Sequence, residues 1–182
     1  MNIRKAKDAD AQGIAKVQVD SWKTTYKGIV SDSFLQKMSY KNLENKWKQI
    51  IDLSGNRNCT LVAENQDGVI VGFVSGGRER SGDYPDFQAE LYAIYLFEKA
   101  QGQGLGRRLF VRLAEELSAS GLASIMVWVL AENHPAKAFY ESLNPEWVDS
   151  QPIEIGGGNH EEVAYGWRDI HGVIGWSLKS MG

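Results

Sequence analysis

The sequence predicts a mixed α/β (α+β) domain, in which one β-sheet carries helices on its faces. Segments with helical periodicity alternate with strand-like segments rich in β-branched residues. Three strand-like segments come in succession, and single helices separate the later ones. No repeat, low-complexity tract or linker-like change in composition divides the 182 residues. We therefore expect one domain over residues 1–182, with a core over about 2–169 and a tail, 170–182, that the pattern does not place.

The first part of the chain is predicted to be mainly helical. A short strand is expected over 2–6. Asp8 or Asp10 caps the helix that follows over 14–26, and Gly28 ends that helix. Two more helices, each begun by a serine, are expected over 31–38 and 40–51. Helical packing should therefore dominate before the main run of strands begins.

After a polar loop over 54–58, the hydrophobic pattern changes to that of strands. The Asp67-Gly68 pair favours a hairpin between the first two strands. One later strand is almost wholly apolar, which is typical of a strand covered on both faces. The strands are expected over 59–64, 69–77, 89–97, 124–130, 147–155 and 161–170, and the helices that interrupt them over 105–120 and 135–143.

Composition excludes several classes of protein. A hydrophobic fraction of 43% and a charged fraction of 24% are ordinary for a globular domain. The net charge of −3 and the lack of a basic cluster argue against nucleic acid as a partner. Cys59 is the single cysteine, and the three histidines have no ligand-like spacing, so neither a disulfide nor a metal site is expected. No signal-peptide core or membrane-spanning apolar run is present, so we expect a cytoplasmic protein with no membrane partner.

The sequence QGQGLGRR places three glycines on alternate positions between a predicted strand and a predicted helix. Either they only permit a tight turn, or they let backbone N–H groups and the helix N-terminus converge on a phosphate. A nucleotide P-loop would need Lys-Ser or Lys-Thr after the last glycine, where Arg107-Arg108 stand. A dinucleotide fingerprint would need another glycine spacing. The pattern therefore fits neither of these two phosphate-binding motifs.

The loop resembles the acetyl-CoA signature of the GCN5-related N-acetyltransferase (GNAT) superfamily. Gln101-x-x-Gly104-x-Gly106 matches that family's Gln/Arg-x-x-Gly-x-Gly/Ala, between two strands that resemble those flanking the signature. Asn133, Ala138 and Phe139-Tyr140-Glu141 match its downstream pattern. The resemblance covers Asn2 to about Asp169. One departure is that Asn144-Pro145 stands where the family has glycine, and asparagine can adopt the same left-handed cap.

The resemblance implies a GNAT-like acyl-CoA N-acyltransferase fold, with a mostly antiparallel sheet of about six to seven strands and helices on both faces. The sheet would splay at a cleft that holds acetyl-CoA as the acyl donor, with no metal. The implied cofactor contacts are the main chain of Ile94, Tyr95 and Leu96 for the pantetheine arm, Gln101, Gly102, Gln103, Gly104, Leu105, Gly106 and Arg107 for the pyrophosphate, and Asn133.

The resemblance also implies two catalytic residues. Tyr140 matches the family's general acid, which protonates the departing thiolate; the alternative is a core aromatic beside Phe139. Glu90 lies where several members keep a base-like glutamate, and the alternative is an ordinary charge at the start of a strand. An amide of Tyr95 or Leu96 is the expected oxyanion donor.

The acceptor is expected to be a primary amine on a small molecule or peptide, which attacks the thioester directly through a tetrahedral intermediate. Trp22 and Tyr26, together with Trp47, are candidates to contact it, against core packing as the alternative. Two other functions stay open: a catalytically silent CoA-binding regulatory module, and a transferase of another acyl group. The sequence also leaves open whether the tail docks on its own core or on a second copy as a homodimer.

Overall fold

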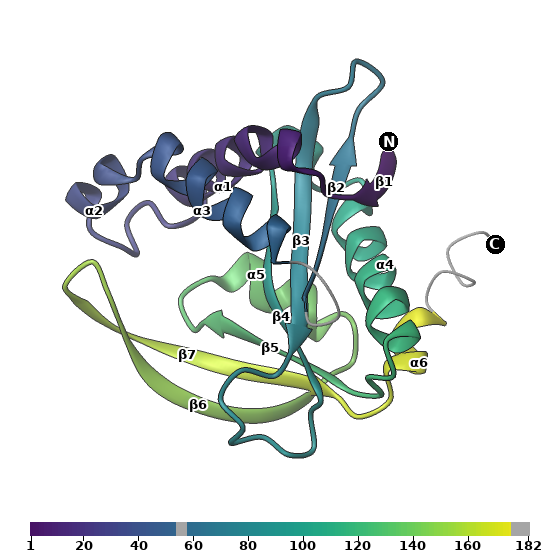
Figure 1. Cartoon of the computed structure of the whole chain (residues 1–182). Helices are drawn as coiled ribbons and strands as arrows, with labels where there is room; N and C mark the ends of the chain where they lie inside the picture. The colour runs from purple at the N-terminus through teal and green to yellow at the C-terminus, as the bar shows by residue number, and fades with distance from the viewer. Residues whose placement is uncertain (54–57, 176–182) are drawn as a thin grey trace.

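The computed structural model describes residues 1–53 and 58–175. They form a seven-stranded sheet in the order β1-β2-β3-β4-β5-β7-β6 (Figure 1). Every neighbouring pair is antiparallel except β4 and β5, which confirms the predicted mostly antiparallel sheet. The strands are β1 (Asn2–Lys5), β2 (Asn58–Glu64), β3 (Ile70–Arg78), β4 (Ala89–Leu96), β5 (Ile125–Leu130), β6 (Glu146–Ile155) and β7 (Gly158–Trp167).

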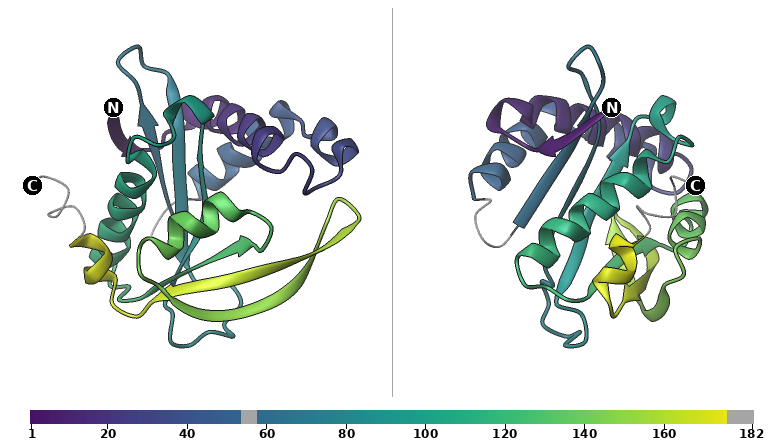
Figure 2. Two further views of the ribbon diagram at one scale, coloured as in Figure 1. Left: turned by 180° about the vertical axis from the view of Figure 1, so that it is seen from behind. Right: turned by 90° about the vertical axis from the view of Figure 1, so that its right-hand side faces the viewer.

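Helices cover both faces of this sheet, as predicted (Figure 2). Apolar residues of α1 and α3 pack with Val62 and Phe73 on one face, and α4 packs on the opposite face of β2, β3 and β4. The apolar face of α4 is buried because its leucines recur at helical spacing. The helices are α1 (Ala11–Thr25), α2 (Asp32–Lys37), α3 (Tyr40–Asp52), α4 (Leu105–Ala119), α5 (His134–Glu141) and α6 (Ile170–Ile174).

The sheet parts between β4 and β5. Their parallel pairing covers only Ala89–Leu91 against Ile125–Val127. The register of β3 and β4 shifts at the same level, where Ser75 pairs with Ala93 but Gly76 pairs with Leu91. Tyr92 is therefore an extra residue in β4, and such a bulge bends its strand. The strands diverge beyond this point and leave one edge of β4 without a partner strand.

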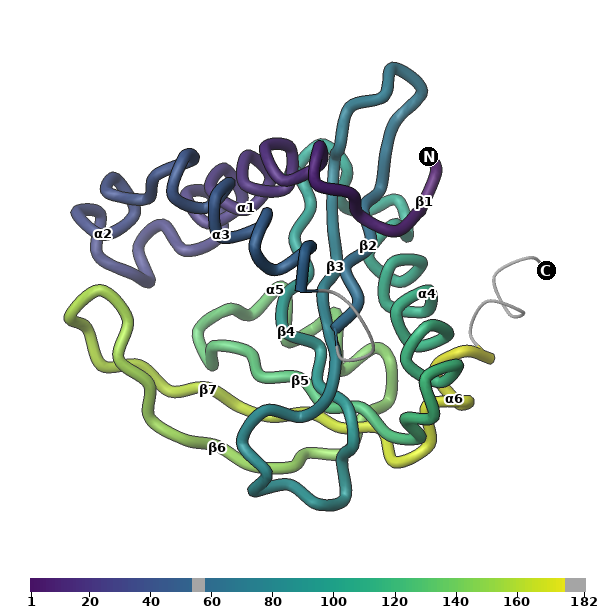
Figure 3. Tube along the Cα trace, viewed as in Figure 1, coloured from purple at the N-terminus to yellow at the C-terminus, as the bar shows by residue number. Residues whose placement is uncertain are grey.

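The hairpin of β6 and β7 reaches from the lower part of the sheet to α2 (Figure 3). The Ser31 hydroxyl donates a hydrogen bond of 3.3 Å to the carbonyl of Gly156 at the hairpin tip. A Cβ on Gly156 would lie 2.7 Å from the Cβ of Phe34, so only glycine permits this close approach. The hairpin and the N-terminal helices thereby enclose one side of the space where the sheet parts.

Three details differ from the sequence prediction. Helix α1 begins at Ala11, earlier than predicted, and the Asp10 carboxylate binds Arg4 and the amide of Lys7 without capping that helix. β7 ends at Trp167, and Ile170, which was assigned to this strand, begins α6. The sequence pattern does not place the tail. In the structure its first part forms α6, which packs against α4 because Ile170 and Val173 are apolar and become buried there. The predicted loop lies outside the described residues over 54–57, as does the tail over 176–182.

Candidate active site

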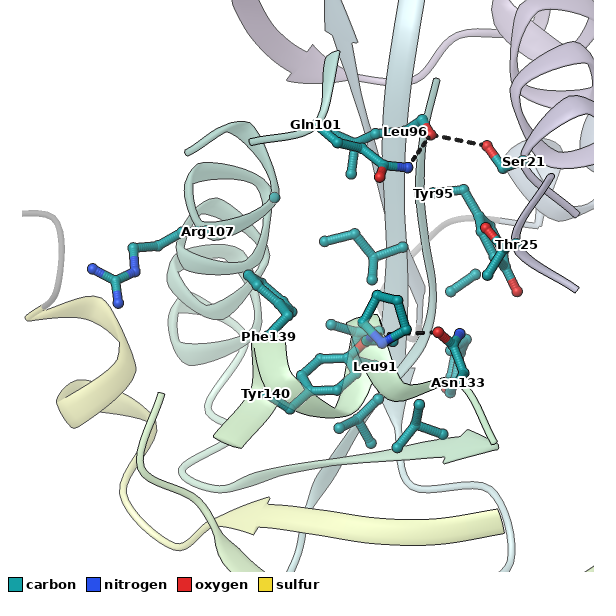
Figure 4. Close-up of a pocket in the computed structure, with 18 of the residues that line it drawn as sticks. Ser21, Thr25, Leu91, Tyr95, Leu96, Gln101, Arg107, Asn133, Phe139 and Tyr140 are labelled. Atoms are coloured by element: carbon teal, nitrogen blue, oxygen red, sulfur yellow. Dashed lines mark hydrogen bonds between the residues drawn. The ribbon is translucent and has the colours of Figure 1, made fainter. Parts of the chain in front are cut away.

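A cleft of about 1440 Å³ occupies the space where β4 and β5 part (Figure 4). It is lined by α1, β4, the glycine loop and α4, β5, α5, and the β6–β7 hairpin. Segments that lie far apart in the sequence thus face one cavity. The site is asymmetric: the glycine loop bounds one end, and the aromatic residues Trp22 and Tyr26 bound the other.

The glycine loop has the backbone that its sequence predicts. Gly102 and Gly104 both have φ of +72°, a conformation that side-chain-bearing residues rarely adopt. A Cβ on either residue would meet no protein atom within 4 Å, so the space beside them is open. Gly104 is the N-cap of α4, and the first helical bond runs from Arg108 N to Gly104 O at 3.1 Å. The amides of Leu105 and Gly106 therefore lack an intrahelical acceptor, which suits an anion such as a pyrophosphate.

The side chains around the loop have different orientations. Gln101 donates from Nε2 to the carbonyl of Leu96 at 3.1 Å and so ties the loop to β4. Gln103 donates to the carbonyl of Lys99 at 3.0 Å. Figure 4 shows the Arg107 side chain extending from α4 away from Tyr140. The loop thus offers main-chain groups to the cleft, as the resemblance implied for the pyrophosphate, and Arg107 is among the residues that line it.

The open edge of β4 carries main-chain groups that alternate in direction. Phe97 N donates to Val71 O of the β3 side, and the carbonyl of Leu96 points the other way, toward Ser21 and Gln101. Because direction alternates along a strand, Ile94 and Leu96 direct their N–H and C=O groups into the gap, and Tyr95 directs its own toward β3. Of the two expected oxyanion donors, only the Leu96 amide faces the cleft, and the Ile94 amide joins it.

Tyr140 lies on α5, on the opposite wall of the cleft. Asn133 caps this helix by accepting a hydrogen bond of 3.2 Å from Ala136 N. The Tyr140 ring packs edge-on to Phe139, and Figure 4 shows both side chains extending from α5 into the cleft. Burial, with a smaller contribution from the neighbouring Tyr26, raises the pKa of Tyr140 well above its ordinary value. The hydroxyl thus remains protonated at neutral pH, as a general acid must.

The far end of the cleft is aromatic. The rings of Trp22 on α1 and of Tyr26, the residue that follows α1, lie 4.5 Å apart between centroids and are tilted by 51°. Trp22 also lies 6.2 Å from Phe34 and 6.4 Å from Tyr95. The indole Nε1 of Trp22 is buried without a hydrogen bond of normal geometry, although the Tyr95 hydroxyl is near enough for the indole to lower the pKa of that hydroxyl. Burial outweighs this effect and raises the pKa of Tyr95 well above its usual value. The two predicted substrate contacts, Trp22 and Tyr26, therefore lie together in the cleft.

Glu90 lies outside the lining of the cleft. Its carboxylate accepts hydrogen bonds from Arg80, at 3.0 Å from Nε and 3.3 Å from the backbone N, and also from Nη2. The guanidinium stacks 4.5 Å from the centroid of the Tyr92 ring. Glu90 is thus a buried, ion-paired carboxylate on a central strand. This position does not support the predicted role as a base, and it differs as well from an ordinary charge at a strand start.

Other candidates separate into lining and core residues. Asn133 lines the cleft, as predicted for a cofactor contact. Trp47 instead packs on Phe73 at 5.0 Å and donates to Gln18 at 2.8 Å, so it belongs to the core. Burial raises the pKa of the Cys59 thiol to about 11, which keeps it protonated and unreactive.

Sequence reasoning missed several lining residues. Ser21 and Thr25 precede and follow Trp22 on the cleft side of α1, and Ser21 donates to the carbonyl of Leu96 at 3.0 Å (Figure 4). Their one-turn spacing around Trp22 was the available signal. Ile153, Ile155 and Glu162 come from the β6–β7 hairpin. Ile153 and Ile155 pack on the apolar cluster that contains Tyr26. No described helix is long and apolar enough to cross a membrane. Within 1–53 and 58–175, no group of three or more metal-ligating side chains occurs.

A parted sheet beside a glycine-rich helix N-terminus, with a buried protonated tyrosine across the gap, defines an acetyl-CoA-dependent acyltransferase. The family model "Acetyltransferase (GNAT) family" matches residues 18–144. The N-acetyltransferase YuaI of Bacillus subtilis strain 168, whose name marks it as uncharacterized, is 41% identical over 170 residues, which are 93% of this chain and 94% of YuaI. The chain therefore belongs to the GNAT family of acetyltransferases, and the resemblance seen in its motifs is confirmed.

More distant relatives agree with this assignment. The spermidine N(1)-acetyltransferase of Thermoplasma acidophilum is 23% identical, with 77% of this chain and 84% of that protein covered. The crystal structure of the PaiA N-acetyltransferase of the same organism, in complex with coenzyme A, superimposes with a TM-score of 0.73 at 21% identity. It covers 91% of this chain and 96% of that one.

Proposed function

We propose that this protein transfers an acetyl group from acetyl-CoA to a primary amine by direct attack. The observation that carries the proposal is the cleft itself. It brings the glycine loop, the unpaired edge of β4 and the Tyr140 side chain to one cavity, although residues 94–140 connect them through a helix and a strand. Acetyl-CoA supplies an activated acetyl thioester in that cavity.

Each part of the cleft has one task in this proposal. The amides of Leu105 and Gly106 bind the pyrophosphate, since they lack an intrahelical acceptor and lie at the positive end of α4. The gap-facing main chain of Ile94 and Leu96 replaces a missing strand for the pantetheine arm. The same edge presents an N–H to the developing oxyanion. Asn133 fixes the start of α5 and thereby the position of Tyr140.

Proton transfer involves both ends of the cleft. The acceptor nitrogen must be neutral to attack and must lose a proton afterwards. Glu90 is bound to Arg80 outside the cleft, so we assign that proton to water in the cleft. Tyr140 protonates the departing thiolate, and its raised pKa keeps that proton available at neutral pH.

The relative that acts on spermidine supports a small amine as the acceptor. A silent CoA-binding module would share the glycine loop but would have no use for a buried tyrosine hydroxyl in the gap. No feature of the loop measures acyl length, so transfer of a longer acyl group is a second outcome that the assay below separates.

The test is a screen of amines with acetyl-CoA in which free thiol is measured over time. We expect thiol release that depends on both the amine and the protein and is nearly abolished in Tyr140→Phe. A protein that binds acetyl-CoA by calorimetry and yet releases no thiol with any amine would be the silent module. Faster release from propionyl-CoA than from acetyl-CoA would instead indicate another acyl donor.

A further inference from the structure

The charged residues that line the cleft are divided between its two ends. Arg107, Arg108, Arg112 and Glu115 all belong to α4, at the end proposed for the phosphates of the donor. At the far end the lining holds one charged side chain, Glu162 of β7. A cationic end thus faces an anionic donor, and a single carboxylate marks the end where the acceptor enters.

In the part of the chain that the structure describes, the side chain that binds Glu162 is neutral. The side-chain amide of Gln151 on β6 donates to its Oε1 at 2.8 Å. No lysine, arginine or histidine within 1–53 and 58–175 forms an ion pair with it. The nearby His160, two residues earlier on the same face of β7, binds Glu132 at 3.2 Å. The carboxylate of Glu162 can therefore accept a further hydrogen bond, from a cation in the cleft.

The surroundings of Glu162 favour an organic cation. Glu162 pairs in register with Leu130, and Trp128 lies two residues away on the same face of β5. Trp128 lines the cleft, as do Ile153 and Ile155 of β6 and the neighbouring rings of Trp22 and Tyr26. Aromatic and aliphatic walls around one carboxylate bind an alkylammonium group well, because they desolvate the ion pair and offer ring faces to the cation.

We propose that Glu162 binds a second ammonium group of the acceptor, so that the protein prefers diamines and polyamines over monoamines. This inference rests on the proposed transfer to an amine and names the substrate class. Val127 is the last residue of β5 paired with β4, and Leu130 lies three residues beyond it. Along the strand this separation is roughly 10 Å. A flexible chain of several methylenes therefore connects an amine in the gap with a cation at Glu162.

Glu161 offers a matched control. It adjoins Glu162, carries the same charge, is exposed and does not line the cleft. Since side chains alternate along a strand, it projects from the other face of β7. Glu161→Gln removes the same charge from the protein without changing the cleft, and so it separates a local contact from the long-range field.

The experiment compares kcat/KM for α,ω-diaminoalkanes of increasing length with n-alkylamines of equal length, for the wild type, Glu162→Gln and Glu161→Gln. Loss of a desolvated ion pair in Glu162→Gln should lower kcat/KM for the preferred diamine by about tenfold or more. For the monoamine the change should stay within about threefold, as for an ordinary surface charge. Glu161→Gln should leave both values near those of the wild type. A diamine-to-monoamine ratio that Glu162→Gln leaves unchanged would overturn the proposal, as would a wild type without diamine preference.

Inhibition of the wild type keeps the proposal testable if Glu162→Gln fails to fold. Bis(trimethylammonio)alkanes cannot be acetylated, and we expect them to inhibit more strongly than mono-trimethylammonio alkanes of the same length. Equal inhibition by the two would count against Glu162. If the wild type releases no thiol with any amine, the proposed transfer fails instead; calorimetric binding of the diaminoalkanes to the wild type and Glu162→Gln then decides the role of Glu162 alone.

Discussion

The two ends of the cleft are built in different ways. The donor end is built from one continuous stretch of chain, the glycine loop and the start of α4, and the main chain of the loop makes the site. The acceptor end combines side chains of α1, β5 and the β6–β7 hairpin, which meet only in the folded chain. The first end offers backbone N–H groups, which every residue type except proline supplies. The second end offers aromatic rings and a carboxylate. A site made by the backbone needs glycines at fixed spacing, so it can be recognised as a motif in the sequence. A site made by side chains from distant segments has no such motif.

Tyr140 stands where the two ends meet, so its removal should have the largest effect. We expect Tyr140→Phe to lower kcat by about a thousandfold, within the range of general-acid contributions, with little change in acetyl-CoA affinity. The raised pKa predicts that kcat of the wild type stays high past pH 10 or so, the ordinary tyrosine value, since the acid is lost only above its own pKa. Steady-state rates over pH, with calorimetry for acetyl-CoA, check both points.

Tyr165→Phe is the control for this change. Tyr165 also packs against Tyr140, with 6.5 Å between ring centroids, but its hydroxyl donates to Glu141 at 2.5 Å and it does not line the cleft. It should retain most of the wild-type rate. Equal kcat in Tyr140→Phe and the wild type would remove the acid role.

A change at the donor end should come next in size. Gly104→Val places a branched side chain in the open space where the pyrophosphate is proposed to lie, and it strains a left-handed backbone. We expect acetyl-CoA to bind at least about a hundredfold more weakly in calorimetry. The control is Gly121→Val, just beyond the other end of α4. Gly121 has φ of +82° and similarly open surroundings, so this variant has the same backbone strain at a position outside the cleft. If both variants bind acetyl-CoA as the wild type does, the loop does not hold the pyrophosphate.

A change at the acceptor end should be smaller and should affect the other substrate. Gly156→Ala puts a methyl group 2.7 Å from the Phe34 side chain, so the hairpin tip must shift. We expect about a tenfold rise in KM for the amine, with an unchanged Kd for acetyl-CoA. Gly157→Ala has a similar positive φ of +79° but meets no atom within 4 Å, and its amine KM should stay near the wild-type value. Parallel losses for both substrates would show that the two ends are not independent.

The smallest effect is expected for Glu90→Gln. Because the carboxylate binds Arg80 outside the cleft, the shape of the kcat/KM against pH profile should be that of the wild type. The ion pair is partly exposed on the arginine side, so the cost should appear as about 1–2 kcal/mol of unfolding free energy in urea titration. Disappearance of the acidic limb of the profile would restore Glu90 as the base.

Much of the fold could be predicted because the hydrophobic periodicity of each segment agrees with the turn and cap residues at its ends. The leucines of α4, the Asp67-Gly68 turn and the apolar β5 each indicated their element. Asn144, with φ of +51°, has the left-handed conformation expected after α5. α6 was missed because five residues with two buried apolar side chains have no readable period.

The candidate site divides in the same way. Its donor half was predictable from glycine spacing, although the direction of the Arg107 side chain and of the Tyr95 amide was not, because rotamer and strand register decide these. Glu162 could not be assigned to the site from sequence. Its place depends on how far the β6–β7 hairpin bends toward α2 and on where β4 separates from β5, and both are set by tertiary packing.

The short parallel ladder of β4 and β5 has a mechanical consequence. In the described sheet, three residue pairs between β4 and β5 join the half formed by β1 to β4 to the half formed by β5, β7 and β6. An extended donor molecule bound along the unpaired edge of β4 would contact both halves and hold them together. We therefore expect bound acetyl-CoA to protect the β4–β5 junction from proteases and hydrogen exchange. Release of CoA should make this junction more mobile again.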